Sequence, residues 1–237
     1  MAGLFHFKQF SIDQTGCAMK VNTDGVLLAA LLDIKDPAQI LDIGTGTGLI
    51  ALMLAQKFPS SSIDAVEIDE NAAGTAGRNF ANSPFSDRIR IFHSAIEDHF
   101  LRRNEKYDLI VSNPPYFINS LRSEDPLKEI ARHTDISFFD RLLINSANKL
   151  KDRGLLYIIL PIGTSERIKK SGISINMLHV QEEILIHSFP DSKPHRTIQV
   201  YGFERVKPLV HNFVIYEKAG LYSSGYRNLL KDYLTIF

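Results

Sequence analysis

Short apolar runs alternate along this chain with longer segments in which apolar residues recur every three or four positions. Apolar runs bounded by turn residues are typical of buried strands, and the longer spacing is typical of helices that pack on one side. The pattern predicts strands near 39–43, 63–68, 88–92, 107–112 and 154–160, and helices near 48–57, 70–82, 96–103 and 138–151. This alternation favours an α/β fold, a mostly parallel sheet flanked by helices.

The pattern changes towards both ends. Residues 4–20 are expected to form a small hairpin, followed by a helix from Asp24 to Leu32 with Thr23 as its N-cap. Gly154 is placed to end the helix before it, and residues 118–134, polar and charged, are expected to form a loop that closes over a substrate.

The last third carries β-branched and apolar residues in two long stretches, 177–189 and 196–216, without a clear helix between them. We expect an antiparallel C-terminal strand pair that closes the sheet, and a final helix over 222–234. A chain of 237 residues with 44% apolar content is most simply one domain, 1–237, in which residues 1–35 form an N-terminal cap.

The predicted strand 107–112 ends abruptly in Asn113, Pro114, Pro115, Tyr116 and Phe117. Successive prolines cannot continue a strand ladder, so the Pro114 carbonyl is available as an acceptor beside the Asn113 side-chain oxygen. Two such acceptors suit a planar amine such as that of adenine, because hydrogen bonds to both N–H groups make its nitrogen more nucleophilic. Tyr116 offers a face for stacking a planar group, with Phe117 as a second one. The simpler alternative is a strand that stops at a proline turn.

A second motif follows the predicted strand 39–43. Gly44, Gly46 and Gly48 precede a helix and allow positive φ angles and close approach of a ligand to the backbone. The spacing Gly-x-Gly-x-Gly differs from the Gly-x-Gly-x-x-Gly of dinucleotide-binding enzymes, because Leu49 occupies the third position of that pattern. Glu67 ends the next strand, where an acid grips ribose hydroxyls in nucleotide-binding α/β folds.

This order of motifs resembles the S-adenosylmethionine-dependent methyltransferase superfamily with the class I fold. The resemblance implies S-adenosyl-L-methionine as cofactor, with its amino-acid half surrounded by Asp42, Gly44, Gly46 and Gly48, and its ribose held by Glu67, with Ile68 beside it. The superfamily often has an acid after the third strand that meets the cofactor adenine, but the matching position here is Ala95. We therefore expect backbone N–H groups of Ala95 or Ile96 to serve there, and Asn113 to border the cofactor.

The resemblance covers nearly the whole chain and is more specific. Segments 7–10, 17–28, 41–44 and 110–116 are similar to the bacterial tRNA adenine-N6 methyltransferases that act on valine tRNA, as are Arg132 and the run Pro194-His195-Arg196. This implies methylation of adenosine 37 in the anticodon loop, with Asn113, Pro114 and Tyr116 as catalytic residues. It also places Lys20, Thr23 and Asp24 in a cap near the cofactor. It further implies that the following residues contact the RNA: Pro115, Tyr116, Phe117, Arg132, Lys193, His195 and Arg196.

Composition agrees with an enzyme of the cytoplasm. No apolar run approaches a membrane span, and the N-terminus lacks a secretion signal. The single cysteine, Cys17, is expected to serve packing, and the eight histidines lack metal-site spacing, so no metal is expected. The net charge is formally zero, but residues 193–237 carry seven Lys or Arg against three acids, interleaved with aromatic residues. This suits contact with RNA phosphates and unstacked bases, although solvated lysines beside core aromatics explain it equally.

Three other functions remain open. Methylation of a protein glutamine amide at N5 uses the same Asn-Pro-Pro-Tyr motif, since an amide is also planar, but such enzymes usually carry a separate N-terminal helical domain. Methylation of DNA adenine or of ribosomal guanine would favour a larger target-recognition domain. A non-catalytic RNA-binding protein on the same fold would not bind the cofactor.

Overall fold

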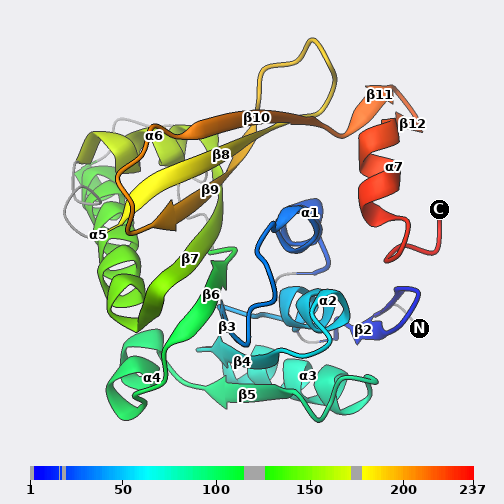
Figure 1. Cartoon of the computed structure of the whole chain (residues 1–237), viewed down its shortest axis with the longest axis horizontal. Helices are drawn as coiled ribbons and strands as arrows, with labels where there is room; N and C mark the ends of the chain where they lie inside the picture. Colours follow the sequence, from blue (N-terminus) through cyan, green and yellow to red (C-terminus); the bar gives the residue numbers. More distant parts are fainter. Residues whose placement is uncertain (1–2, 16, 18–19, 115–125, 172–177) are drawn as a thin grey trace.

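The computed structural model describes residues 3–15, 17, 20–114, 126–171 and 178–237, and for residues 126–137 it describes only the helical backbone. Its central feature is a sheet of eight strands (Figure 1). In the order β10-β8-β9-β7-β6-β3-β4-β5, these strands are β10 (Leu209–Val214), β8 (His179–His187), β9 (Arg196–Gly202), β7 (Leu150–Pro161), β6 (Tyr107–Ser112), β3 (Gln39–Ile43), β4 (Ser62–Glu67) and β5 (Ile89–His93).

Strand β9 runs antiparallel to both of its neighbours, β7 and β8. The other neighbouring pairs described in this sheet are parallel. The predicted α/β fold, mostly parallel with an antiparallel C-terminal strand pair, is therefore confirmed. Strand order reverses at β3, because the chain runs outward through β4 and β5 and then returns to β6 on the other side of β3. A crevice at the carboxyl end of β3 is thus expected to bind the ligand.

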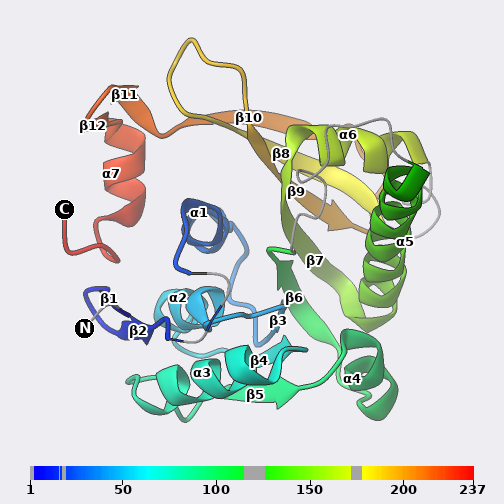
Figure 2. The same cartoon turned by 180° about the vertical axis from the view of Figure 1, so that it is seen from behind.

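Helices cover both faces of the sheet (Figures 1 and 2). One face carries α1 (Thr23–Leu31), α2 (Leu49–Lys57), α3 (Glu70–Ala81) and α7 (Ser224–Leu230), and the other carries α4 (Ile96–Arg102), α5 (Pro126–Lys149) and α6 (Ile162–Ser171). Strand β6 shows why: Leu109 and Val111 enter the first core, whereas Ile110 enters the second. A strand buried on both faces is continuously apolar rather than alternating.

The N-terminal segment packs against the end of the chain. Strands β1 (Leu4–His6) and β2 (Ser11–Asp13) form a short hairpin, and β11 (Tyr216–Lys218) pairs with β12 (Leu221–Tyr222) near α7. Phe7 forms an isolated bridge with Leu234, and the Lys8 side chain donates to the carbonyls of Lys231 and Phe237. Both labelled termini accordingly lie on the same side of the molecule (Figures 1 and 2).

Several predicted boundaries were wrong. The N-cap of α1 is Asn22, whose side-chain oxygen accepts from Gly25 N, rather than Thr23. Helix α5 begins at Pro126 instead of near 138, so residues 126–134 of the predicted loop are helical. Gly154 lies inside β7, where a Cβ atom would meet the Tyr107 carbonyl oxygen at 2.8 Å, so close backbone approach explains the glycine.

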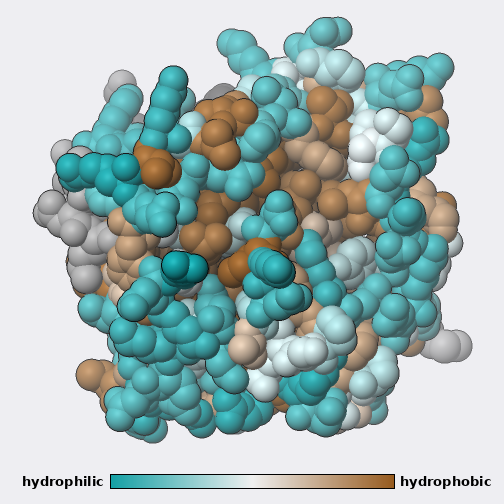
Figure 3. Space-filling view, in the orientation of Figure 1, coloured by the Kyte–Doolittle hydropathy of each residue, from teal (hydrophilic) through white to brown (hydrophobic). Residues whose placement is uncertain are grey.

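The C-terminal third also differs in detail. The stretch 196–216 is divided into β9 and β10, and β10 pairs in parallel with β8 at the sheet edge. Helix α6 was not predicted, and α7 is shorter than the expected helix over 222–234. Edge strand β10 exposes Leu209 and Val210. In the space-filling view, apolar surface gathers in the region of β8 to β10 and α1 (Figure 3).

Candidate active site

The glycine turn between β3 and α2 forms the floor of the crevice. Gly44, Gly46 and Gly48 have φ angles of 71°, 57° and 85°, in the left-handed region that favours glycine. A Cβ atom on Gly44 or Gly46 would meet no atom within 4 Å, whereas one on Gly48 would lie 2.4 Å from Phe80 Cε1. The first two glycines therefore open onto free space, and the third is required by helix packing.

Asp42 lies beneath this turn and holds it together. Its carboxylate is fully buried, and Oδ2 accepts from the Thr45 hydroxyl at 2.6 Å and from Ala51 N at 3.1 Å. Oδ1 is buried without a hydrogen-bond partner. Burial raises the pKa of Asp42 to about 7, against the two hydrogen bonds, and the charge of Glu67 raises it further. Asp42 thus supports the loop from below and does not line the crevice.

Glu67 connects the end of β4 to the glycine turn. Its Oε2 accepts from Gly46 N at 2.9 Å, and its Oε1 accepts from Ile68 N at 2.9 Å and Asp69 N at 3.0 Å. The side chain is half-buried and lines the crevice. A carboxylate offers about four acceptor positions, so capacity remains for a further donor.

A hollow of about 300 Å³ extends from the glycine turn towards α4. Its walls are mainly apolar, and polar groups enter from Glu67, Asp69, Ser94 and Glu97. Asn113 and Pro114 border it at the end of β6. The apolar lining comes from residues of several elements: Ile43, Val66, Ile68, Ala72, Ile96 and Phe138.

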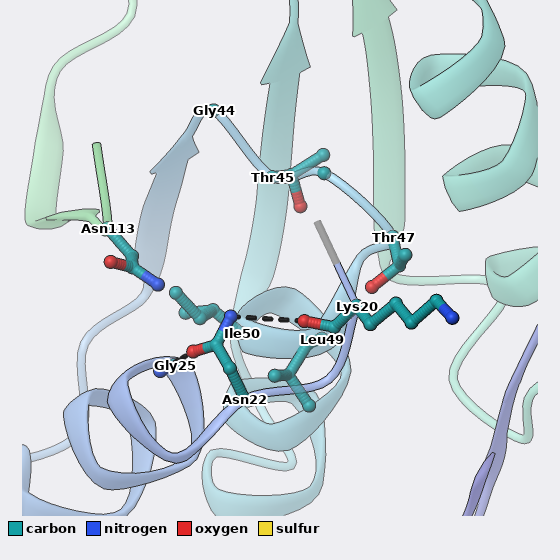
Figure 4. A pocket seen from close by; sticks show the side chains of 10 residues that line it. Lys20, Asn22, Gly25, Gly44, Thr45, Thr47, Leu49, Ile50 and Asn113 are labelled. Atoms are coloured by element: carbon teal, nitrogen blue, oxygen red, sulfur yellow. Dashed lines mark hydrogen bonds between the residues drawn. The ribbon is translucent and has the colours of Figure 1, made fainter. Parts of the chain in front are cut away.

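A smaller hollow of about 30 Å³ lies on the other side of Gly44 and Gly46, and Asn113 borders both hollows. Asn113 is 7% exposed and approaches the start of α1, since a Cβ atom on Gly25 would lie 3.7 Å from its Nδ2. Asn113 and Asn22 face this hollow from β6 and from the segment before α1 (Figure 4). Lys20 also lines it, although its ammonium points away from Asn113 in this view.

Asn79 of α3 joins the glycine turn to the N-terminal hairpin. Its Nδ2 donates to the carbonyls of Thr47 at 2.8 Å and Asp13 at 2.9 Å, and its Oδ1 accepts from Asp13 N at 2.9 Å. The side chain is 3% exposed. The Gln14 side chain accepts from Val21 N at 2.7 Å, which ties the residue before Asn22 to the residue after β2. The N-terminal segment is therefore built onto the crevice.

Basic residues predicted to contact RNA lie at the start of β9 and in the loop before it. Lys193 and His195 are exposed, and Arg196 is half-buried. Arg196 Nε donates to Asp24 Oδ2 at 2.8 Å. Desolvation and the neighbouring Arg196 lower the pKa of His195. Because Asp24 precedes Gly25, the pair links β9 to the rim on which Asn113 lies.

Other predicted site residues lie elsewhere. Thr23 is exposed and borders neither hollow. Ala95 is the N-cap residue of α4, and its neighbours Ser94 and Ile96, rather than Ala95 itself, line the larger hollow. Pro115, Tyr116 and Phe117 lie outside the described residues, as does the side chain of Arg132.

Several residues that line the hollows were not assigned a role from the sequence, among them Asn22, Glu97 and Phe138. Asn22 had a readable signal, because Asn-Thr-Asp-Gly opens a helix. Phe138 had none, since it comes from the middle of a long helix. Cys17, expected to serve packing, is a half-buried free thiol that also borders the larger hollow.

Within the described residues, no group of three or more His, Cys, Asp or Glu side chains is arranged to hold a metal ion. In the same part of the chain, no helix combines the length and the apolar character that a membrane crossing requires.

Comparison with solved structures identifies the fold. A predicted O-methyltransferase from Agrobacterium tumefaciens matches with a TM-score of 0.67 at 18% identity, covering 89% of this chain and 96% of that one. The fold is thus that of the class I methyltransferases, with the crevice at the carboxyl ends of β3, β4 and β6.

Sequence relatives narrow the class to one family. A Pedobacter heparinus protein named tRNA1(Val) (adenine(37)-N6)-methyltransferase is 47% identical over the full length of both chains. A Bacteroides thetaiotaomicron protein of the same name is 39% identical over 97% of this chain and 96% of its own. The model of the methyltransferase small domain matches residues 16–165. The chain belongs to the tRNA1(Val) (adenine(37)-N6)-methyltransferase family, as its resemblance in sequence predicted.

Proposed function

We propose that this protein transfers a methyl group from S-adenosyl-L-methionine to N6 of adenosine 37 in the anticodon loop of a valine tRNA. The observation that carries the proposal is the place of Asn113. This buried amide follows β6 and borders both hollows, so an amine beside it lies next to whatever occupies the crevice. Relatives that carry the tRNA methyltransferase name match the chain from end to end, which supports the substrate.

The crevice fits this cofactor. Gly44 and Gly46 leave the space above their Cα atoms open, and the apolar walls of the larger hollow suit an adenine ring. Glu67 is the acceptor for the ribose hydroxyls, with Ile68 beside the ring. Ser94, Ile96 and Glu97 surround the end where the adenine edge would lie, so Glu97 joins the backbone of Ala95 and Ile96 as a candidate partner of the adenine amine. When bound, the cofactor supplies a methyl group on a sulfonium sulfur.

The smaller hollow suits the amino-acid half of the cofactor. Gly44, Gly46, Lys20 and Asn22 surround it. Thr23 and Gly48 support this binding indirectly, because they set the backbone at the start of α1 and of α2. Asp42 supports it by accepting the hydrogen bond from Thr45 that holds the glycine turn.

Asn113 and Pro114 act on the target base. The Asn113 oxygen and the Pro114 carbonyl accept from the two N–H groups of N6, which draws the nitrogen lone pair out of the ring and aims it at the methyl group. Positioning would lower the barrier without a strong base. As the N–C bond forms, the bond from the methyl carbon to the sulfonium sulfur would break and leave a neutral thioether, and the amine proton would then go to solvent. The base must leave its stack, which an anticodon loop permits more readily than a duplex.

Residues beyond the pocket bind the rest of the RNA. Tyr116 is assigned to stacking on the target base, and Pro115, Phe117 and Arg132 are assigned to RNA contact; these four roles rest on the sequence alone. Lys193, His195 and Arg196 contact RNA from the β9 side of the rim. The protein acts in the cytoplasm as a single domain with no metal.

Two alternative functions can be weighed against specific observations. Methylation of a glutamine amide in protein uses the same two acceptors, but relatives at 36–47% identity all carry the tRNA methyltransferase name. A non-catalytic RNA-binding protein requires no cofactor crevice, yet the glycine turn and Glu67 are intact.

The test is radiolabelled methyl transfer to bulk tRNA, protein and DNA from a host that lacks this enzyme, followed by nucleoside analysis. We expect label as N6-methyladenosine in valine tRNA, and none in a transcript with guanosine at position 37. Label in protein would move the assignment to the glutamine amide. No label in any pool, together with no cofactor binding, would leave the non-catalytic function.

A further inference from the structure

The loop between β8 and β9, residues 188–195, is built as a fixed turn. The Ser192 hydroxyl donates to the Phe189 carbonyl at 2.8 Å and accepts from Phe189 N at 3.0 Å, and Ser192 N donates to the same carbonyl at 3.0 Å. His187 Nδ1 lies 2.6 Å from the Ser192 carbonyl, and its Nε2 lies 2.9 Å from Asn212 Oδ1. His195 N donates to Ile186 O at 3.0 Å and closes the loop.

This fixed turn presents an aromatic ring outward. Phe189 is 39% exposed, although it is large and apolar. A ring with one open face on a rigid support loses little conformational entropy when a planar group stacks on it. An exposed side chain of this kind on an ordered loop is more typical of a contact site than of packing.

Behind Phe189 stands an aromatic column of four rings, Phe189, Tyr216, Tyr222 and Tyr226. Adjacent ring centroids are separated by 5.7 Å, 4.9 Å and 4.7 Å, and the two inner pairs are stacked, with interplanar angles of 21° and 8°. Tyr226 is buried, Tyr216 and Tyr222 are half-buried, and Phe189 is the outer end. The column therefore runs from the core to the surface and ends in a ring that is 39% exposed.

The same loop leads to the rim of the active site. Exposed Lys193 follows Phe189 by four positions, and Arg196, where β9 begins, pairs with Asp24 at the start of α1. The loop projects beyond α1 on the side of β11, β12 and α7 (Figures 1 and 2). A nucleic acid that reaches Asn113 across this rim would continue over the loop.

We propose that the outer ring of the aromatic column, Phe189, binds an unstacked base of the tRNA other than the methylated adenosine, with the Lys193 ammonium on an adjoining phosphate. This inference rests on the proposed function, since it concerns the same substrate. Single-stranded RNA is recognised by aromatic faces on which bases stack and by cations that follow the backbone. A stacking face next to a cation matches that chemistry, and the exposed neighbours of Phe189 do not extend it into an apolar patch. Asp191 is an acid, so Lys193 is the cation of this loop that is available to a phosphate.

Steady-state methyl transfer to a valine tRNA transcript tests the proposal. Phe189→Ala should raise KM for the tRNA at least about fivefold, because loss of one base stack weakens binding by that factor or more. The value of kcat at saturating tRNA and the cofactor Kd should not change. Phe189→Trp, which keeps a stacking face, should stay within about twofold of the parent.

The chain offers a matched control in Phe203. It is 38% exposed, as Phe189 is, but it follows the opposite end of β9. Phe203→Ala should leave KM unchanged. Lys193→Ala should reduce the slope of log K against log salt for tRNA binding by about one. Lys207→Ala, close in sequence to Phe203, should leave that slope unaltered.

Each outcome has a separate meaning. The proposal about Phe189 is overturned if Phe189→Ala has the same KM as the parent, or if Phe203→Ala raises KM as much as Phe189→Ala does. In either case, methyl transfer by the parent still upholds the proposed function. If the parent enzyme methylates no tRNA, the proposed function fails, and direct binding of the transcript to the same five variants then decides whether Phe189 contacts RNA. Melting temperatures of the variants separate lost contact from lost folding.

Discussion

Arg196 and Asp24 lie 172 positions apart in sequence, yet Arg196 Nε donates to Asp24 Oδ2 at 2.8 Å. Both side chains are largely buried, with 27% and 20% of their surfaces exposed. The pair fastens the first residue of β9 to the first turn of α1, and it thereby joins a strand near the sheet edge to the helix whose Gly25 approaches Asn113. One arginine is thus available for two roles, as a structural link and as an RNA contact.

Two single variants separate these roles. Asp24→Asn and Arg196→Gln both break the ion pair, and each should lower the free energy of unfolding by about 1 kcal/mol. Only Arg196→Gln should also weaken tRNA binding, since only it removes a cation. Neither should change the cofactor Kd. Equal tRNA affinity in the two variants, measured by filter binding, would leave Arg196 with the structural role alone.

Asn113→Ala should abolish methyl transfer while the cofactor Kd changes little. The variant removes an acceptor that acts on the target amine, so kcat should fall by roughly 10²–10³, the range for loss of one preorganised hydrogen-bonding group. Single-turnover transfer and cofactor titration by calorimetry measure the two quantities. Loss of cofactor binding together with activity would contradict the assigned role.

Tyr116→Ala should lower kcat/KM for tRNA by a factor of about 5 to 150 if one base stacks on the ring. This factor corresponds to a loss of about 1–3 kcal/mol of binding free energy in the transition state. Tyr116→Phe keeps the ring and should retain most of this activity. Parental turnover in the alanine variant would refute the stacking role of Tyr116.

Gly46→Ala and Gly48→Ala should fail in different ways. Both residues have positive φ, which costs an alanine about 1–2 kcal/mol. A methyl group on Gly46 meets no protein atom and points into the crevice, so cofactor affinity should suffer more than stability. A methyl group on Gly48 would lie 2.4 Å from Phe80, which adds overpacking of about 1–3 kcal/mol.

Melting temperature and cofactor Kd, measured for both glycine variants, distinguish these effects. The double variant Gly48→Ala with Phe80→Leu should recover part of the lost stability, because it removes the ring that the methyl group meets. Equal losses of cofactor affinity in the two single variants would show that the glycine turn responds as one unit.

Asp42 should make stability depend on pH. Its pKa rises from 3.8 to about 7 on folding, so between these values the folded chain holds a proton that the unfolded chain has released. The contribution of Asp42 to the free energy of unfolding therefore falls as pH rises from 4 to 7, by an amount on the order of a few kcal/mol, and is constant above that window.

Asp42→Asn removes this titration. The melting temperature of the variant minus that of the parent should increase as the pH is raised from 4 to 7, and the substituted amide still offers one oxygen to Thr45 and Ala51. A difference that stays flat over this range would mean that the carboxyl group titrates normally in the folded protein.

The central strands were predictable because a strand that is buried on both faces is continuously apolar in sequence. Leu109, Ile110 and Val111 are all fully buried, so the run has no polar interruption. Helix α6 has no such apolar run, since Gly163, Thr164 and Ser165 follow its first residue and Ile168 is its apolar contact with the core. The start of α5 was hidden by charged residues, although Pro126 at its first position is a recognised start signal.

The candidate site was predictable where a motif carries it. The glycine turn, Glu67 and Asn113 meet at one crevice because carboxyl ends of neighbouring parallel strands share one edge of the sheet. The role of Asn79 could not be predicted from a sequence motif. It lies in an ordinary amphipathic helix, and its three hydrogen bonds to Asp13 and Thr47 depend on how three distant segments pack.

Glu67 accepts three backbone hydrogen bonds, from Gly46, Ile68 and Asp69. A diol that reaches this carboxylate must share its oxygens with the loop or take them over. About one acceptor position of the carboxylate remains for the first hydroxyl, so the second hydroxyl has to displace a backbone donor, and the net strength of binding includes the loss of that bond. This loss moderates the affinity at Glu67, which suits a cofactor that must bind and be released in every turnover.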